Sequence, residues 1–212
     1  SCLCTDNTRF QAAQDKEPKR WDFIFCGRLE PAKSPDFSLD VAVRCSQRLG
    51  RRVSILLVGS GSMESELKQK AQELNRHIDV HFAGFAKQEE LPGLYHSAKI
   101  FLFPTKADVW GVVANEACAA GLPVLITPYA GAAGELIIDG KNGFIRELDA
   151  DAWSDCAIRL LQNEKRREAF GKHAQLLVKP YDFDAAARGI VEATMAAYGS
   201  QRDGQVAVSR PV

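Results

Sequence analysis

Four charged side chains lie at positions from which they could bind phosphate and sugar hydroxyl groups. Arg28 and Lys33 flank Pro31 in the loop after an apolar run, while Asp108 and Glu116 belong to a later segment. A guanidinium group meets phosphate oxygens as a planar fork and an ammonium group as a compact charge, whereas a carboxylate accepts hydrogen bonds from hydroxyl groups. Solvated loop charges are the usual alternative for Arg28 and Lys33, so their place in the fold decides between the two.

The segment 101–127 would position both acids. Its apolar run ends at Phe103, Gly111 opens a stretch with helical apolar spacing, Gly121 ends that stretch and Pro123 begins another extended run. This pattern predicts a strand, a loop, a helix and a strand in a parallel sheet. The loop would then lie at the carboxyl edge of the sheet, facing the amino end of the next helix, where open α/β folds hold anions.

The same edge should gather the basic loop and the helix start. Arg28 and Lys33 would converge there on one diphosphate. Backbone N–H groups at the helix start would complete the cradle, namely those of Gly111, Val112 and Val113. Glycine at position 111 would let a phosphate approach without a Cβ in the way.

Glu116 lies among small apolar residues, where an acid is seldom fully buried unless it is paired or hydrogen-bonded. A carboxylate at this position could accept hydrogen bonds from both ribose hydroxyls of a nucleotide. The alternative is a structural salt bridge. We weigh the binding role above the salt bridge.

The remaining pattern predicts an α/β domain. Strands are expected at Trp21–Cys26, Val53–Val58, Val80–Phe82, up to Phe103, after Pro123 and at Phe144–Ile145. Helices are expected near 36–49, 63–74, 89–97, 150–162, 165–178 and 183–198. The alternation predicts a Rossmann-like, doubly wound parallel sheet of about six strands with helices on both faces. Residues 1–20 are expected to be a linker or arm, 21–198 the domain and 199–212 a flexible tail.

Composition excludes several classes of protein. The 212 residues are 46% hydrophobic and carry 27 basic and 27 acidic side chains. This balance gives no broad field for nucleic acid or an anionic membrane. No apolar run approaches the roughly 20 residues that span a bilayer, and a cytoplasmic location is expected.

Three other patterns have simpler structural explanations. The Gly59-Ser60-Gly61-Ser62 turn lacks the third glycine of a dinucleotide fingerprint, so it is interpreted as a tight turn that could line a cleft. The two Asp-x-Asp triplets, 149–151 and 182–184, are expected to cap helices rather than chelate metal. The cysteines and histidines lack metal-ligand spacing.

Five segments resemble the carboxy-terminal nucleotide-binding domain of GT-B glycosyltransferases of family 4, glycosyl transferases group 1. They are CGRLEPAKSPDFSLDVA, LLVGSGSMESELKQKAQEL, HFAGFAKQEELPGLYHSAKIFLFPT, DVWGVVANEACAAGLPVL and AGAAGELIIDGKNGF. The resemblance extends over residues 21–198 in the family's order and spacing. The fourth segment resembles the family's E-x7-E signature.

The resemblance implies donor-binding roles for particular residues. Arg28 and Lys33 would hold the donor diphosphate and stabilise the leaving nucleotide without a metal or other cofactor. Backbone groups at Gly111 and Val112 would bind phosphate or sugar, and Glu116 would bind ribose. The other implied positions are Gly27 at the end of the first strand, Phe85 and Ala86 beside the base, and Trp110.

Asp108 would take the place of the first acid of the signature, which contacts the donor sugar. Most relatives have Glu at this position, so the shorter side chain puts the choice of sugar and the activity itself in question. Trp110 replaces the usual Phe, and Ser34 replaces the usual Gly after the lysine.

By resemblance, the full protein would be a retaining, metal-independent transferase that moves a sugar from a nucleoside diphosphate to a polysaccharide, lipopolysaccharide or glycolipid acceptor. The acceptor would bind mainly to an amino-terminal domain beyond this chain, without which the chain would be inactive. Peripheral contact of the full protein with a membrane is compatible with such an acceptor. Two alternatives stay open: an enzyme resembling the nucleotide-sugar 2-epimerases, and a nucleotide-binding module without catalysis.

Overall fold

A six-stranded, all-parallel sheet forms the centre of the molecule, in the order β3-β2-β1-β4-β5-β6. The computed structural model describes residues 4–12 and 19–205. The strands are β1 (Trp21–Cys26), β2 (Val53–Val58), β3 (Ile78–Gly84), β4 (Ala98–Phe103), β5 (Val124–Ile126) and β6 (Gly143–Ile145). The predicted fold class is therefore confirmed.

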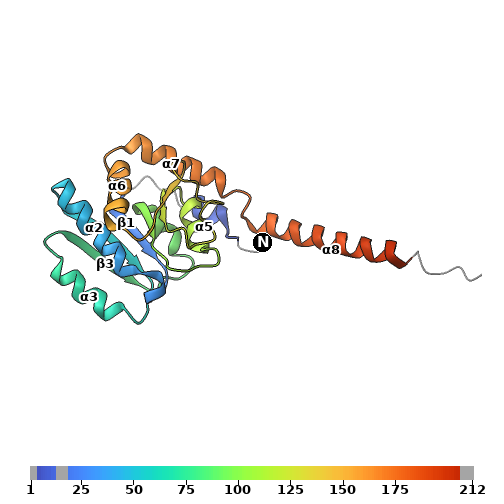
Figure 1. Cartoon of the computed structure of the whole chain (residues 1–212), viewed down its shortest axis with the longest axis horizontal. Coiled ribbons are helices and arrows are strands. Elements are labelled where there is room, and N and C mark those ends of the chain that lie inside the picture. The colour runs from blue at the N-terminus through green and yellow to red at the C-terminus, as the bar shows by residue number, and fades with distance from the viewer. Residues whose placement is uncertain (1–3, 13–18, 206–212) are drawn as a thin grey trace, which may run out of the picture.

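Helices cover both faces of this sheet (Figure 1). One core cluster includes residues of α2 (Pro35–Leu49), α3 (Glu64–Glu73) and α6 (Ala150–Leu161). The other includes residues of α1 (Asn7–Ala12), α4 (Leu91–His96) and α5 (Val112–Ala119), and α7 (Glu164–Leu177) contributes to both. Within β1, Phe23 and Phe25 enter the first cluster and Ile24 the second, as the period of two requires.

The order of the strands creates a switch point between β1 and β4. The chain moves outward from β1 through β2 to β3, and then returns to the other side of β1 as β4. Loops after β1 and β4 consequently leave the sheet in opposite directions, which opens a crevice at the carboxyl edge. Arg28 and Lys33 follow β1, and Asp108 follows β4.

The amino-terminal segment contains a helix that the sequence pattern did not predict. The short helix α1 contacts α4 and α5, and the buried ring of Phe10 meets Tyr95 edge-on at a centroid distance of 5.7 Å. The described part of the expected linker thus packs onto the domain. Residues 1–3 and 13–18 of that linker lie outside the described residues.

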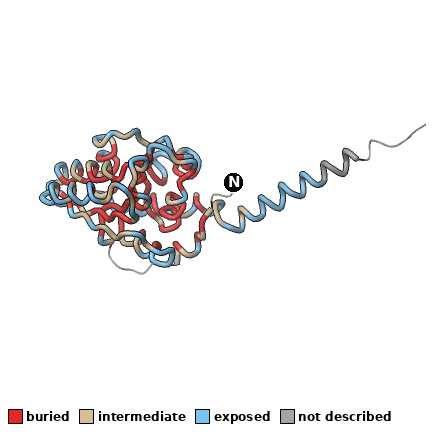
Figure 2. The backbone as a smooth tube through the Cα atoms, turned by 90° about the horizontal axis from the view of Figure 1, so that it is seen from below, coloured by how far each residue is buried: buried red, intermediate tan, exposed pale blue. Residues whose placement is uncertain are grey.

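The last helix, α8 (Phe183–Gln205), projects away from the body of the molecule (Figures 1 and 2). It continues beyond the expected end at Tyr198 into the segment predicted to be a flexible tail, while residues 206–212 of that tail lie outside the described residues. Its apolar side chains Ile190, Val191 and Met195 are exposed.

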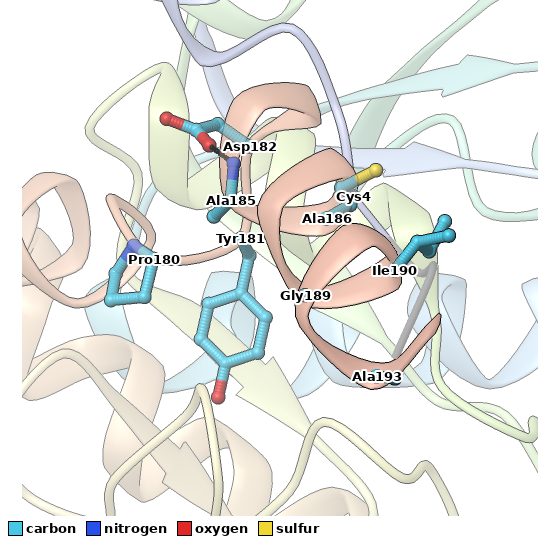
Figure 3. Close-up of a pocket in the computed structure, with 9 residues that line it drawn as sticks. All are labelled: Cys4, Pro180, Tyr181, Asp182, Ala185, Ala186, Gly189, Ile190 and Ala193. Atoms are coloured by element: carbon cyan, nitrogen blue, oxygen red, sulfur yellow. Dashed lines mark hydrogen bonds between the residues drawn. The ribbon is translucent and has the colours of Figure 1, made fainter. Parts of the chain in front are cut away.

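A cavity of about 400 Å³ lies at the base of α8. Figure 3 shows its lining, with the Asp182 side chain accepting a hydrogen bond of 2.6 Å from the amide of Ala185. The side chain of Asp149 likewise accepts bonds from the amides of Asp151 and Ala152 at the start of α6. Both Asp-x-Asp triplets therefore begin with a helix cap, as predicted.

Candidate functional site

A cleft of about 300 Å³ opens at the carboxyl edge of β1 and β2, beside α5. Five of the residues predicted to bind a ligand contribute to its lining, although they come from three separate segments. They are Gly27, Arg28, Phe85, Ala86 and Glu116. Other lining residues are Cys26, Val58, Gly59, Ser60, Gln88, Leu91 and Val113. The structure therefore brings together a basic loop, an exposed aromatic ring and a buried acid.

Glu116 is the buried acid of this cleft, with 7% of its surface exposed. Burial raises the pKa of its carboxyl, and a hydrogen bond from Tyr95 opposes that rise. The Tyr95 hydroxyl donates to Glu116 Oε2 at 2.8 Å. Among the described residues no basic group lies within 4.0 Å of the Glu116 carboxylate, so the structure does not support the alternative of a structural salt bridge.

The Gly59–Ser62 turn lies against the loop that carries Arg28. A Cβ at Gly59 would come within 1.9 Å of the Gly27 carbonyl oxygen, and one at Gly61 within 2.4 Å of the Leu29 carbonyl oxygen. These glycines are needed because the two loops approach each other so closely. Glu30 joins the loops further by accepting hydrogen bonds from the Ser62 amide at 2.9 Å and hydroxyl at 2.7 Å.

Lys33 and Asp108 form an ion pair at 2.6 Å and are not among the residues that line the cleft. Lys33 Nζ also donates to the Ala107 carbonyl at 3.1 Å and to the Thr105 hydroxyl at 3.4 Å. Asp108 Oδ1 accepts a bond of 3.1 Å from the Trp110 amide. Both oxygens of this carboxylate therefore already have partners within the protein, and the ion pair ties the loop after β1 to the loop after β4.

Gly111 begins α5 with a φ of 98°, in the left-handed region. A Cβ there would lie 2.4 Å from the ring of Phe103. We expected glycine to spare a phosphate from contact with a Cβ. The structure corrects this reason, because the space is occupied by the Phe103 ring.

The Trp110 side chain lies in the core and does not line the cleft. It is 7% exposed, and its indole N–H donates to Asn115 Oδ1 at 2.8 Å. Its ring also lies 5.1 Å from that of Tyr181. Any contact of Trp110 with a ligand is therefore left to its backbone. Val112, by contrast, is 38% exposed at the start of α5.

One thiol in the lining of the cleft bears on its chemistry. Burial raises the pKa of Cys26 to about 12, so this thiol stays neutral and is a poor nucleophile at physiological pH.

Within residues 4–12 and 19–205, no group of three or more His, Cys, Asp or Glu side chains could hold a metal ion. In the same described part of the chain, no helix is both long and apolar enough to cross a bilayer.

Sequence reasoning did not find Tyr95, Thr105 or the Glu30–Ser62 contact. Tyr95 lies inside one of the quoted segments, but a single sequence gives no sign that its hydroxyl reaches Glu116 from another helix. Thr105 and Glu30 act through hydrogen bonds to residues more than 30 positions away. Only the tertiary structure shows such contacts.

Comparison with known proteins identifies the family. The family model described as glycosyl transferases group 1 matches residues 6–177. D-inositol 3-phosphate glycosyltransferase of Corynebacterium urealyticum is 31% identical over 175 residues, covering 79% of this chain and 41% of that protein. The chain spans about two fifths of the length of such curated relatives.

Solved structures share the fold. The C-terminal domain of LpcC, a glycosyl transferase group 1 family protein of Francisella tularensis, aligns with a TM-score of 0.72 and 23% identity, covering 84% of this chain and 99% of that one. HepE of Anabaena, in complex with UDP and glucose, aligns with a TM-score of 0.73 and 20% identity, covering 92% and 54%. The family match and the shared sheet agree: this chain belongs to the glycosyl transferases group 1 family and has the fold of a GT-B carboxy-terminal domain.

Proposed function

We propose that the chain is the donor-binding half of a retaining glycosyltransferase. The full protein would transfer a sugar from a nucleoside diphosphate to a polysaccharide, lipopolysaccharide or glycolipid acceptor. The observation that carries the proposal is the cleft at the switch point, where Arg28 and the buried Glu116 lie on one cavity. A cation suits the diphosphate, and a hydrogen-bonded carboxylate suits the ribose hydroxyls.

Electrostatic stabilisation is the proposed source of catalysis. Negative charge develops on the departing nucleoside diphosphate, and Arg28, Lys33 and the amino end of α5 would offset it. Preorganised groups of this kind need no reorganisation during the reaction. Lys33 would act from the loop after β1, the loop that also carries Arg28 and that the ion pair with Asp108 holds in place. No metal or other cofactor is required in this scheme.

Asp108 would contact the donor sugar in the proposed complex, as the first acid of the family signature. Gly111 and Val112 would offer backbone N–H groups at the start of α5. Phe85 is 80% exposed and lines the cleft together with Ala86, and a nucleobase could be accommodated against these residues. UDP is the first nucleotide to test, because HepE was solved with UDP.

The proposed partner of this chain is an amino-terminal acceptor domain, since the curated relatives are more than twice as long as the matched region. The exposed apolar residues of α8 would meet that domain, which would also supply the acceptor site. The chain alone would then bind donor without transferring sugar. We place the full protein in the cytoplasm, with peripheral contact to a membrane if its acceptor is a lipid.

Calorimetry tests the donor site. UDP, GDP and ADP would each be titrated into the chain and into its Glu116→Ala variant. One diphosphate is expected to bind the parent, and the variant at least about tenfold more weakly, a loss of about 1.4 kcal/mol. Failure of all three to bind the parent would overturn the assignment of the cleft.

Activity of the full protein tests the transfer reaction. With donor and acceptor present, the glycosylated product is expected, and the anomeric configuration of its new bond should match that of the donor. Product formed from donor alone, without acceptor, would instead indicate an epimerase-like enzyme. An Arg28→Ala variant that keeps turnover within a few-fold of the parent would contradict the role given to Arg28.

A further inference from the structure

Tyr95 connects the cleft to the interior of the domain. Its side chain is completely buried on α4, and its ring packs against Phe10 of α1 and Phe101 of β4 at centroid distances of 5.7 and 5.6 Å. A ring held on two sides has little freedom to rotate about its first torsion angle. The hydroxyl at its end is therefore fixed in space, 2.8 Å from Glu116 Oε2.

In this hydrogen bond Tyr95 is the donor and Glu116 is the acceptor. Burial raises the pKa of the Tyr95 hydroxyl well above its usual value, so the group stays protonated and donates. The carboxylate of Glu116 must accept. Because a carboxylate has two oxygens, a bond to Oε2 orients the group and leaves Oε1 for a ligand in the cleft.

We infer that Tyr95 is a positioning residue for nucleotide recognition: its hydroxyl orients the Glu116 carboxylate toward the ribose hydroxyls of a nucleoside diphosphate. This inference rests on the proposed function, because that proposal assigns ribose to Glu116. It goes beyond it by naming a residue outside the cleft lining that sets the geometry of the ribose contact.

The inference explains why an acid is tolerated in this part of α5. A carboxylate surrounded by small apolar side chains is costly to bury unless a donor is present. Tyr95 supplies one charge-assisted hydrogen bond without adding a second charge, so the acid remains free of an ion pair that a ribose hydroxyl would have to displace. A salt-bridged acid would be less available to a neutral ligand.

The test compares Tyr95→Phe with the parent chain. The probes are whichever of UDP, GDP and ADP binds the parent most tightly and the 2′,3′-dideoxy counterpart of that diphosphate. Loss of the Tyr95 hydroxyl should weaken binding of the ribonucleotide about tenfold. The dideoxy compound has no ribose hydroxyl to donate to Glu116, so its affinity should change by less than about twofold. Equal losses for both compounds, or no loss for either, would overturn the inference.

Tyr129→Phe is the matched control. The Tyr129 hydroxyl also hydrogen-bonds a glutamate, Glu147, but this pair is exposed and outside the cleft. Its removal should leave both affinities unchanged. A loss of ribonucleotide binding in Tyr129→Phe similar to that in Tyr95→Phe would show that the effect is not specific to the Glu116 contact.

A double variant separates positioning from general damage to the fold. If Tyr95 acts through Glu116, adding Tyr95→Phe to Glu116→Ala should change ribonucleotide affinity by less than about twofold, because the residue it orients is gone. The double variant has no Glu116 carboxylate, so removal of the Tyr95 hydroxyl does not leave a buried charge without its hydrogen-bond donor. A further tenfold loss in the double variant would contradict the inference while leaving the donor site itself intact.

The pH dependence of binding gives a second readout. The groups that face Glu116 are Tyr95 from α4, Cys26 from β1 and, at longer range, Arg9 from α1. Without the Tyr95 bond the carboxyl should hold its proton to higher pH, so the acidic limb of the affinity profile should move to higher pH in Tyr95→Phe. An unchanged limb would contradict the inference. If no diphosphate binds the parent at all, the proposed function fails, and the inference with it.

Discussion

At the scale of single residues, Glu116 links the stability of the domain to its proposed function. Its pKa is raised by burial, so the folded state binds the proton of this carboxyl more tightly than the unfolded chain does. Such a group favours folding fully below its unfolded pKa and loses that contribution as the pH rises through the folded value. At neutral pH the ionised, buried carboxylate therefore weakens the fold.

Glu116→Gln is expected to stabilise the chain at neutral pH. The amide oxygen can still accept the Tyr95 hydrogen bond, while the charge is removed, and we expect a gain of about 1 kcal/mol, within the range of single stabilising substitutions. The free energy of unfolding should be measured in urea at pH 7.5 and 4.5. The gain should shrink toward the lower pH, and a variant that is less stable at pH 7.5 would contradict this account.

Ser34 holds an unfavourable backbone conformation beside the site. It follows Lys33 with a φ of 48°, and it is the single non-glycine residue with positive φ among the described residues. A Cβ in the left-handed region costs about 1 kcal/mol. The family resemblance places glycine at this position, and the structure supplies the physical reason.

Ser34→Gly should therefore raise the free energy of unfolding by about 0.5 kcal/mol, because removal of the strain outweighs the added freedom of the unfolded chain. Ser34→Ala is the matched control, since it keeps the Cβ and removes only a weak bond of 3.4 Å to the Pro31 carbonyl. Alanine should bring no gain. A stabilisation of equal size in both variants would show that the hydroxyl, and not the backbone, is responsible.

At the scale of elements, the start of α5 depends on close packing between Gly111 and β4. The positive φ and the ring of Phe103 together exclude a side chain at this position. The same turn sets where the helix presents its N–H groups and where Glu116 lies. A small change here should therefore affect both stability and binding.

Gly111→Ala is expected to lower the free energy of unfolding by about 2 kcal/mol, through backbone strain and overpacking against Phe103. Gly93→Ala is the control, because nothing lies within 4 Å of a Cβ at this position in α4. Its helical setting should make the change neutral or slightly stabilising. Thermal unfolding of the two variants would decide, and equal losses would refute the packing argument.

The amino-terminal helix α1 is an element that the sequence pattern did not predict. Helix α1 has only six residues, too few for a clear hydrophobic period, and its stability comes from the burial of Phe10 against α4 and α5. A segment of this kind looks like a linker until its packing partner is known. The expected strands and longer helices were predicted because each carries its own periodicity.

At the scale of the whole molecule, the proposed mechanism gives positive charge at the switch point the part that a metal ion has in metal-dependent transferases. Arg28 and Lys33 both follow β1, and α5 directs its amino end to the same edge of the sheet. The acids of the Asp-x-Asp triplets begin α6 and α8 as helix caps. Helix capping accounts for both triplets.

The proposed transferase activity of the full protein should therefore be unaffected by chelators. In the presence of millimolar EDTA, turnover is expected to stay within about twofold of the untreated enzyme, because in the proposed mechanism protein cations would offset the charge on the leaving diphosphate. Initial rates with and without EDTA measure this. Loss of activity that added Mg²⁺ or Mn²⁺ restores would contradict metal-independent catalysis.

The sequence by itself determined the α/β class, the parallel sheet and the edge where the charged residues gather. These follow from local patterns: apolar runs of strand length, helical spacing between them, and glycines where the first three strands end. The chemistry of Arg28, Lys33, Asp108 and Glu116 was likewise visible, since the charge of a side chain in a loop after a strand, or in the helix that follows, is a property of one short segment.

Only the tertiary structure decided how these residues are arranged. It paired Lys33 with Asp108, turned the Trp110 ring into the core and placed the Tyr95 hydroxyl against Glu116. Each of these contacts depends on tertiary packing. A hydrogen bond of 2.8 Å between the Tyr95 hydroxyl on α4 and the Glu116 carboxylate on α5 leaves no periodic signal in the sequence of either helix. Local patterns fix which segments meet at an edge, whereas side-chain packing fixes which atoms touch.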